Sequence, residues 1–232
     1  MKRLDAMLSV TGQGSRKECR TWIKKGLVTV NDILITEPGY YVGEQDTVLL
    51  SGRPVFGGYM YLMMNKPVGY VSATCGDERC VLQLVPDIYR HKALFPAGRL
   101  DKETSGFLLL TDDGVFGHQV TSPKRHLKKV YIAQLDKAVG DETIHSFAEG
   151  ILLRDGYYTK PAIIRVLDKP TIAEVTLYEG KYHQIRRMFA ACGLYVQQLE
   201  RVQIGEVVLD KMLQPGQSRS LTEEEKKLLK NA

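Results

Sequence analysis

The chain has 232 residues, 44% of them hydrophobic and 25% charged, with a formal net charge of +5. This length and apolar content fit one domain of ordinary size beside a small one and exclude an intrinsically disordered chain. The apolar stretches are too short to cross a bilayer and the N-terminus lacks a signal peptide, so we expect a cytoplasmic protein with no membrane partner.

The first 26 residues predict two short helices. Leu4, Met7 and Leu8 recur at helical spacing before a Gly-containing loop. Ser15 and Glu18 then form the capping box of a second helix. The buried stripe and the terminating glycine of this second helix are Cys19, Trp22, Ile23 and Gly26.

Positive charge is concentrated in this segment. It carries seven basic and two acidic side chains, a local balance of 7 − 2 = +5. The candidate RNA-binding residues are the basic stripe of the second helix, Arg16, Lys17, Arg20 and Lys24, and the adjacent Lys25. For an isolated helix a solvated charged face is the more common explanation, but the charge asymmetry favours a nucleic-acid partner.

A hairpin and a linker are predicted after these helices. Asn31 and Asp32 separate two short apolar runs, as in a two-residue hairpin turn. Two helices and a hairpin resemble the small RNA-binding domain named after the fourth protein of the ribosomal small subunit. We assign residues 1–55 to this domain and expect a linker over residues 51–58, which contain three glycines and a proline.

The remaining residues, 59–232, predict a larger α+β domain with a mixed, mainly antiparallel sheet and flanking helices. Strand-like runs occur at residues 61–65, 107–111, 130–135, 162–167, 173–178 and 206–210, separated by turn sequences such as Asp112-Asp113-Gly114. Two helices are expected over residues 142–150 and 185–192. Residues 222–230 form a charged tail.

Common cofactor and metal motifs are missing. The sequence contains neither a P-loop nor a Rossmann fingerprint, and the four cysteines form no CxxC pair, which favours free thiols. Each of the five histidines stands alone in the sequence, which favours surface or hydrogen-bonding roles over metal ligation. We therefore predict no cofactor and no metal.

One stretch, GRLDKETSGFLLLTDDG at residues 98–114, places an isolated carboxylate, Asp101, between two glycines. The next acids that could share a metal, Asp112 and Asp113, lie beyond a predicted strand about 17 Å long. An aspartate three residues before a threonine is most often a turn or capping residue. The sequence context decides between that role and a chemical one.

This stretch resembles the signature of the RNA pseudouridine synthases, GRLDxxTxGLLLLTxDG, with Phe107 at an aliphatic position. Further similarity runs through MNKPVGYVSA, TSPKRHLKKVY, EGKYHQIRRMFAACG and LQPGQSRSLTEEE, where Ser220 replaces the usual proline. With the N-terminal module, the resemblance covers nearly the whole chain. It implies isomerisation of a flipped-out uridine to pseudouridine, without cofactor or metal.

The resemblance implies three catalytic residues. Asp101 acts as nucleophile or base, and both roles stay open. Tyr131 stacks under the uracil and takes the C5 proton, although strand alternation alone also fits a core tyrosine. Arg186 pairs with Asp101 and keeps it ionised, with a solvated helix arginine as the alternative.

Further residues are expected to touch RNA. Gly98 and Gly106 allow close approach of the backbone to RNA, and Arg99 holds a phosphate or the gap left by the base. From the similar segments, Lys66, His183 and Arg187 are added as RNA-binding candidates.

Within the family, the spacing in TSPKRHLKKVY and the C-terminal LQPGQSRSLTEEE resemble the type that acts on small-subunit (16S) ribosomal RNA. We further expect the RNA to be bound within a small-subunit assembly intermediate and the enzyme to be a monomer. Two alternatives stay open. One is a synthase acting on 23S or transfer RNA, and the other is a non-catalytic RNA-binding protein of ribosome assembly.

Overall fold

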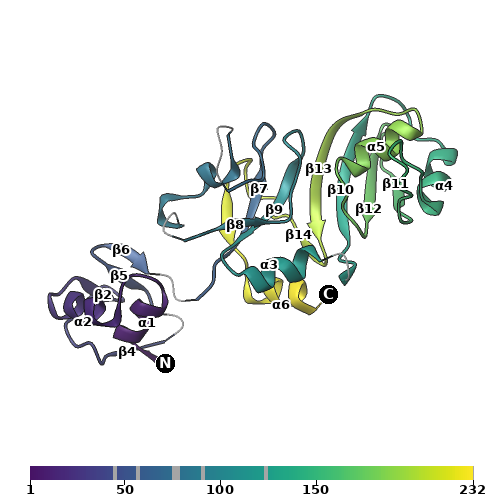
Figure 1. The fold of residues 1–232 in the computed structure, drawn as a ribbon. Coiled ribbons are helices and arrows are strands. Elements are labelled where there is room, and N and C mark those ends of the chain that lie inside the picture. The colour runs from purple at the N-terminus through teal and green to yellow at the C-terminus, as the bar shows by residue number, and fades with distance from the viewer. Residues whose placement is uncertain (44–45, 56–57, 75–78, 90–91, 123–124, 232) are drawn as a thin grey trace. The chain divides into compact units, whose positions relative to one another are not determined.

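The computed structural model describes residues 1–232 except 44–45, 56–57, 75–78, 90–91, 123–124 and 232. The chain divides into two compact units, Met1–Met60 with Asp87–His91, and Tyr61–Pro86 with Lys92–Ala232 (Figure 1). Cys75 and His91, which the sequence analysis considered, lie outside the described residues. The other cysteines, Cys19, Cys80 and Cys192, are free thiols, as expected.

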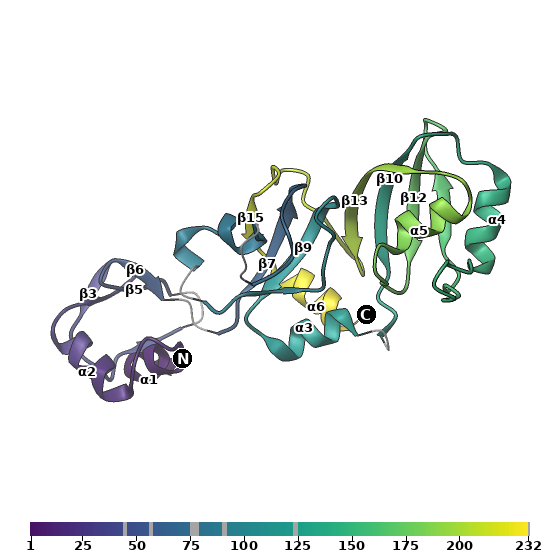
Figure 2. The same ribbon diagram turned by 45° about the horizontal axis from the view of Figure 1, so that its top comes forward.

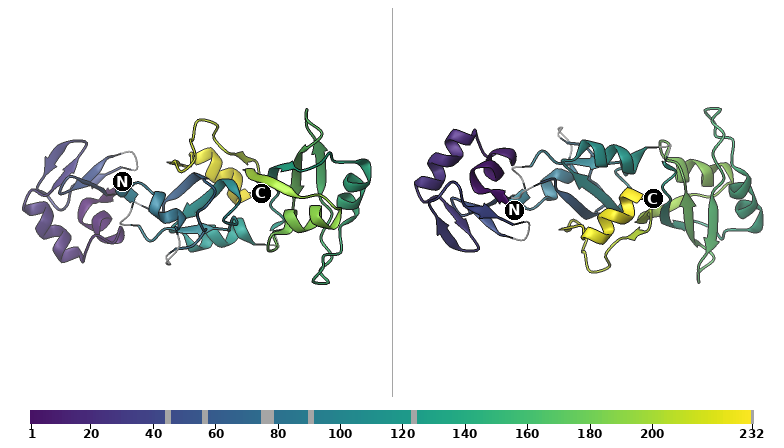
Figure 3. Two further views of the ribbon diagram at one scale, coloured as in Figure 1. Left: turned by 90° about the horizontal axis from the view of Figure 1, so that it is seen from above. Right: turned by 90° about the horizontal axis from the view of Figure 1, so that it is seen from below.

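The first unit packs two helices on small sheets. Its elements are β1 (Lys2–Arg3), α1 (Leu4–Val10), α2 (Arg16–Lys24), β2 (Val28–Val30), β3 (Ile33–Ile35), β4 (Tyr41–Val42), β5 (Val48–Leu50), β6 (Arg53–Val55) and the 3₁₀ helix η2 (Asp87–Tyr89). Four strands form a sheet in the order β3-β2-β5-β6, and β1 pairs with β4. In the ribbon the helices of this unit, drawn in purple, lie against its strands (Figure 3). Leu4, Leu8, Cys19 and Ile23 are fully buried in its core.

Local signals in this unit are confirmed. Ser15 and Glu18 form a complete capping box at α2, and Gly26 follows the helix with a φ of 70°. Asn31 and Asp32 both have positive φ in the β2–β3 turn. The linker expected at residues 51–58 is wrong over its first half, because Ser51 and Gly52 form the turn that pairs β5 with β6.

The second unit holds a mixed sheet of nine described strands. Its elements are β7 (Tyr61–Lys66), η1 (Val81–Leu84), β8 (Phe95–Ala97), β9 (Ser105–Thr111), α3 (Gly114–Thr121), β10 (Lys129–Leu135), α4 (Asp141–Glu149), β11 (Ile163–Val166), β12 (Ile172–Leu177), α5 (Gln184–Ala191), β13 (Val196–Ile204), β14 (Val207–Val208), β15 (Ser218–Ser220) and α6 (Glu223–Asn231). The main order is β11-β12-β10-β13-β9-β7-β15, with β8 on β9 and β14 on β13 (Figure 2).

Two antiparallel halves meet at a single parallel seam. β13 pairs with β9 through Glu200 opposite Ser105 and Arg201 opposite Gly106. A Cβ on Gly106 would lie 2.3 Å from the carbonyl oxygen of Arg201, and φ at Gly106 is 99°. The sequence analysis assigned this glycine to close approach of RNA, and that was wrong. Its missing side chain lets two strands of the sheet approach each other.

Helices pack beside both halves. α4 and α5 lie beside β10, β11 and β12 (Figure 1), and the rings of Phe147 of α4 and Phe189 of α5 have centroids 4.7 Å apart. Phe116 of α3 and Leu229 of α6 enter the core around β7 and β9. The Asp112-Asp113-Gly114 turn therefore leads into a helix, and Asp113 caps α3 by accepting hydrogen bonds from the backbone N–H groups of residues 115 and 116.

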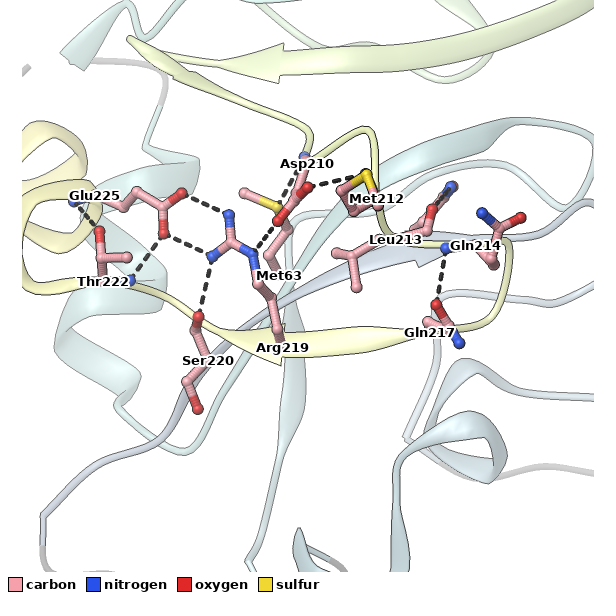
Figure 4. Close-up of polar contacts among 11 residues, drawn as sticks. Met63, Asp210, Met212, Leu213, Gln214, Gln217, Arg219, Ser220, Thr222 and Glu225 are labelled. Atoms are coloured by element: carbon pink, nitrogen blue, oxygen red, sulfur yellow. Dashed lines mark hydrogen bonds and ion pairs between the residues drawn. The ribbon is translucent and has the colours of Figure 1, made fainter.

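The C-terminal motif LQPGQSRSLTEEE forms the edge strand β15 and the start of α6, joined by a network of polar contacts (Figure 4). Arg219 of β15 donates to Asp210 over 2.6 Å and to both carboxylate oxygens of Glu225 over 2.8 and 2.9 Å. Thr222 and Glu225 cap α6 reciprocally. The charged tail thus forms a helix that is fixed to the sheet. The charges of Arg219, Asp210 and Glu225 are used in these contacts within the fold.

Candidate active site

A cavity of about 560 Å³ lies within the second unit. It is lined by the loop from Ala97 to Lys102 before β9 and by the segment from Glu179 to Ile185 that leads into α5. Tyr131 of β10 and Arg201 of β13 contribute from the sheet. Segments far apart in sequence thus converge on one hollow large enough for a nucleotide.

Asp101 lines this cavity and is about one-third exposed. Its Oδ1 lies 3.5 Å from Nε2 of His183, at the start of α5. The sequence analysis left Asp101 without a histidine near it, and the fold changes that. The carboxylate faces the cavity beside a titratable imidazole.

The loop that carries Asp101 is fixed from beneath. Lys66 is fully buried, and its Nζ donates to the carbonyls of Pro67, Lys102 and Thr104 over 3.0, 3.3 and 2.7 Å. Burial lowers the pKa of Lys66 to about 8, opposed by the charges of Asp101 and the nearby Glu103. Ser72 adds a pair of hydrogen bonds to the backbone of Leu100. The catalytic candidate therefore sits on a rigid support.

This burial contradicts one RNA-binding assignment. Lys66 cannot meet a phosphate, because its ammonium group is enclosed and bound to three backbone carbonyls. Its functional contribution is to hold the loop. A buried ammonium group satisfied by carbonyls is not visible in a sequence motif.

Tyr131 is 9% exposed and lines the cavity from β10. It pairs with Val175 on β12 and with Arg201 on β13, and a bulge between Val130 and Tyr131 interrupts the second ladder. Bulges often redirect a side chain next to a site. The tyrosine ring therefore belongs both to the core and to the cavity wall. The two alternatives from the sequence, a core tyrosine and a tyrosine at the site, are compatible in this structure.

Arg186 occupies a different role from the one expected. Its Nη1 donates to the carbonyl of Val196 and its Nη2 to the carbonyl of Glu103, each over 2.9 Å. In the described part of the chain it forms no ion pair with Asp101. The guanidinium group instead ties α5 to the start of β13 and to the loop that carries Asp101.

Replacing Arg186 by methionine is expected to lower turnover about hundredfold, because a loop displaced by about 1 Å misplaces the carboxylate. The loss should be the same from pH 6 to pH 9. An ion pair with Asp101 would predict recovery at high pH, where the carboxylate ionises without help. The measurement is single-turnover conversion across this range, with exposed Arg165→Met as the control.

The segment before α5 is held by a buried acid. Glu179 accepts hydrogen bonds from the hydroxyl of Tyr157, the backbone N–H of Lys160 and the amide of Gln184, over 2.6, 2.9 and 2.7 Å. Burial raises the pKa of Glu179, but these hydrogen bonds outweigh it and leave the pKa below its usual value. Glu179 is thus an ionised anchor for the segment that presents His183.

His183 and Tyr182 form a stacked pair at the cavity. Their ring centroids are 3.9 Å apart at 15°, and Tyr182 is 76% exposed. Arg99 also lines the cavity. Arg187 instead pairs with Asp155 over 2.5 Å, outside the residues that line the cavity in the described part of the chain.

Four of the described cationic residues that line the cavity were not singled out from the sequence: Lys102, Lys129, Lys181 and Arg201. Lys129 stands two residues before Tyr131 on the same face of β10, so strand alternation alone could have indicated it. Arg201 lies on β13, a strand that was not predicted. Both line the cavity next to Tyr131.

The N-terminal unit contains an arginine cluster around one buried acid. Asp5 is fully buried and pairs with Arg3, Arg16 and Arg20 over 3.1, 3.5 and 2.8 Å. Burial raises the pKa of Asp5, but the hydrogen bonds and charges of the arginines outweigh it and hold that pKa well below its usual range. Arg16 and Arg20 remain about half exposed, so they can face a partner in a fixed orientation.

Lys17 and Lys24 of α2, and Lys25 directly after it, are exposed and supply charge without an ion pair in the described part of the chain. Changing all three to glutamine should reduce the slope of log affinity against log salt by about 2 on single-stranded RNA, if each meets a phosphate. Filter binding at several salt concentrations measures this slope. The matched control changes Lys137, Lys169 and Lys211 of the second unit, and an equal reduction there would contradict the assignment.

Comparisons with known proteins agree with this division. Residues 60–191 match the family model described as RNA pseudouridylate synthase, and residues 2–48 match the S4 domain. A Bacillus subtilis protein named uncharacterized RNA pseudouridine synthase YtzG is 42% identical, over 98% of both chains. The Escherichia coli ribosomal small subunit pseudouridine synthase A is 39% identical, over 96% of this chain and 97% of its own.

A solved structure described as a pseudouridylate synthase superposes with a TM-score of 0.71. It shares 35% sequence identity, and the match covers 99% of this chain and 100% of that one. The arrangement of an S4 domain followed by a mixed-sheet domain is therefore shared along the whole length.

Proposed function

The chain belongs to the RNA pseudouridylate synthase family, and we propose that it converts one uridine of small-subunit ribosomal RNA to pseudouridine. The observation that carries the proposal is the convergence of Asp101, Tyr131 and His183 on one cavity. The choice of RNA rests on the relatives named as small-subunit enzymes, which match over nearly the whole chain.

The reaction breaks the N1–C1′ bond of uridine, turns the base and joins C5 to C1′. A carboxylate at the cavity wall, Asp101, serves as nucleophile or base toward the ribose. The ring of Tyr131 stacks under the extruded uracil, and its hydroxyl takes the C5 proton. The loop contacts of Lys66 and Arg186 keep the carboxylate in place.

Binding and chemistry are divided between the two units. Residues 1–55 supply affinity through the basic face of α2, and residues 59–232 supply the reaction, with Arg99 and His183 on the RNA at the cavity. We place the substrate in a small-subunit assembly intermediate in the cytoplasm and the enzyme as a monomer. In the part of the chain that the structure describes, every helix is too short or too polar to span a bilayer.

The test is a map of pseudouridine in ribosomal and transfer RNA from cells with and without the gene. We expect one small-subunit position to lose its pseudouridine and to regain it with the wild-type gene but not with Asp101→Asn. Loss of a pseudouridine from large-subunit or transfer RNA instead would show that this other RNA is the substrate. An unchanged map in all these RNAs would exclude the enzyme activity proposed for this cavity.

A further inference from the structure

We infer that Arg201, assisted by Lys129, binds a carbonyl oxygen of the target uracil and stabilises the negative charge that the base carries when its glycosidic bond breaks. This inference rests on the proposed function and gives a role to two residues to which the family resemblance assigned none. Both residues line the cavity.

The guanidinium group of Arg201 is buried and incompletely bonded. The residue is 3% exposed, and its Nε donates to the carbonyl of Phe107 over 2.8 Å. Its Nη2 is buried without a hydrogen-bond partner among the described residues. A buried charged donor without an acceptor is costly, so this geometry is expected where a ligand completes it.

No acid neutralises Arg201 within the described residues. Of the acids that line the cavity, Glu179 accepts hydrogen bonds from Tyr157, Lys160 and Gln184, and Asp101 lies beside the imidazole of His183 without an ion pair to Arg201. Arg201 therefore brings uncompensated positive charge to the cavity wall, which favours an electron-rich ligand.

Lys129 adds a second cation to the same region. Its Nζ donates to the carbonyl of Leu127 over 3.1 Å, and the residue is only partly exposed. Burial, together with the charge of Arg201, lowers the pKa of Lys129 to about 8. The two side chains keep a positive region of the cavity beside the tyrosine.

The position favours a base oxygen over a phosphate. Tyr131 and Arg201 are directly opposite each other on neighbouring strands, so their side chains stand on one face of the sheet. A uracil stacked on the tyrosine therefore has its edge near the guanidinium group. The more exposed cations Lys102 and Lys181 line the cavity as well and are better placed for the phosphates of the chain.

Cleavage of the glycosidic bond creates the negative charge that a cationic donor at the base can stabilise. When N1–C1′ breaks, its electron pair stays on the base, and the resulting uracil anion shares its charge between the ring nitrogen and the two carbonyl oxygens. C1′ is left electron-poor toward Asp101. When C5 bonds to C1′, the C5 proton leaves and N1 gains a proton, so the whole step is an isomerisation. Fixed cationic donors at the oxygens stabilise the anion without reorganising.

Arg201→Met should lower the single-turnover rate by about a hundredfold to a thousandfold, the range for a lost oxyanion donor. RNA affinity should stay within about threefold, since the backbone phosphates dominate it. The thermal midpoint should change by no more than about 4 °C, because the variant also removes an uncompensated buried charge. Arg201→Lys, which keeps the charge, should lose about tenfold and serves if the methionine variant does not fold.

The decisive experiment combines these variants with RNA whose target uridine carries sulfur in place of O2 or of O4. In the wild type, one of the two sulfur substitutions should slow conversion. In Arg201→Met or Arg201→Lys the same substitution should have little further effect, because the contact is already lost. Arg165→Met should retain the full wild-type sensitivity.

Three outcomes would overturn the inference. Equal sulfur sensitivity in wild type and in both Arg201 variants would show that the arginine does not touch a base oxygen. A loss of affinity and of salt dependence with an unchanged rate would assign Arg201 to a phosphate. A wild-type protein that converts no uridine in ribosomal or transfer RNA would remove the proposed function and this inference together.

Discussion

Asp101→Asn should lower the rate of uridine conversion by several orders of magnitude while leaving the protein folded. The amide is nearly isosteric with the carboxylate and keeps an oxygen at the position that lies 3.5 Å from Nε2 of His183. It can neither attack a carbon nor take a proton efficiently. The loss of a positioning group alone would cost ten- to hundredfold. The measurement is single-turnover release of tritium from C5-labelled uridine in small-subunit RNA at saturating protein.

RNA affinity distinguishes a loss of catalysis in Asp101→Asn from a loss of RNA binding. RNA binding by Asp101→Asn should stay within about tenfold of wild type, because phosphate contacts dominate affinity. Asp155→Asn is the matched control, since Asp155 is an exposed acid paired with Arg187 away from the cavity. Residual activity above about one per cent of wild type would make Asp101 a structural turn residue, and the catalytic role would have to pass to another group.

Gly106→Ala should have the largest effect on folding, lowering the free energy of unfolding by roughly 3 kcal/mol or more. The new methyl group would lie 2.3 Å from the oxygen and 2.8 Å from the nitrogen of the Arg201 backbone. Neither atom can move without breaking the parallel seam between β9 and β13. The positive φ adds strain for any side chain. Urea denaturation of the full chain gives the value.

Gly114→Ala is the control for this prediction. Gly114 begins α3, and a Cβ there meets nothing within 4 Å. We expect its stability to stay within about 0.5 kcal/mol of wild type, or to rise slightly, because alanine favours the helix. If Gly106→Ala were as stable as this control, the seam would be softer than its contacts imply, and its glycine would need another explanation.

Much of the fold could be predicted because local signals were consistent. The capping box of α2, the Asn31-Asp32 turn and the apolar runs of β7, β9, β10 and β12 each specify an element within a few residues. β13 was missed for a physical reason. One of its inward positions is Arg201, which breaks the alternation of apolar and polar residues that marks a strand.

The site was less predictable because it depends on contacts between distant segments. Asp101 and Tyr131 lie in recognisable motifs, and both line the cavity. The neighbourhood of Asp101 and His183, 82 residues apart in sequence, arises only when α5 packs beside the loop. The enclosure of Lys66 and the redirected hydrogen bonds of Arg186 likewise follow from tertiary packing. A motif identifies such residues without showing what they bind.

The backbone at His183 limits how this position can drift in evolution. Its φ of 48° and ψ of 33° are left-handed, a conformation that glycine, asparagine, aspartate and histidine adopt more readily than other residues. Asparagine, one nucleotide away from histidine in the genetic code, would satisfy the backbone but remove the titratable ring beside Asp101. Leucine, equally close in the code, would fail on both grounds. A residue at this position therefore has to satisfy two separate requirements, a left-handed backbone and an imidazole ring beside Asp101, and histidine satisfies both.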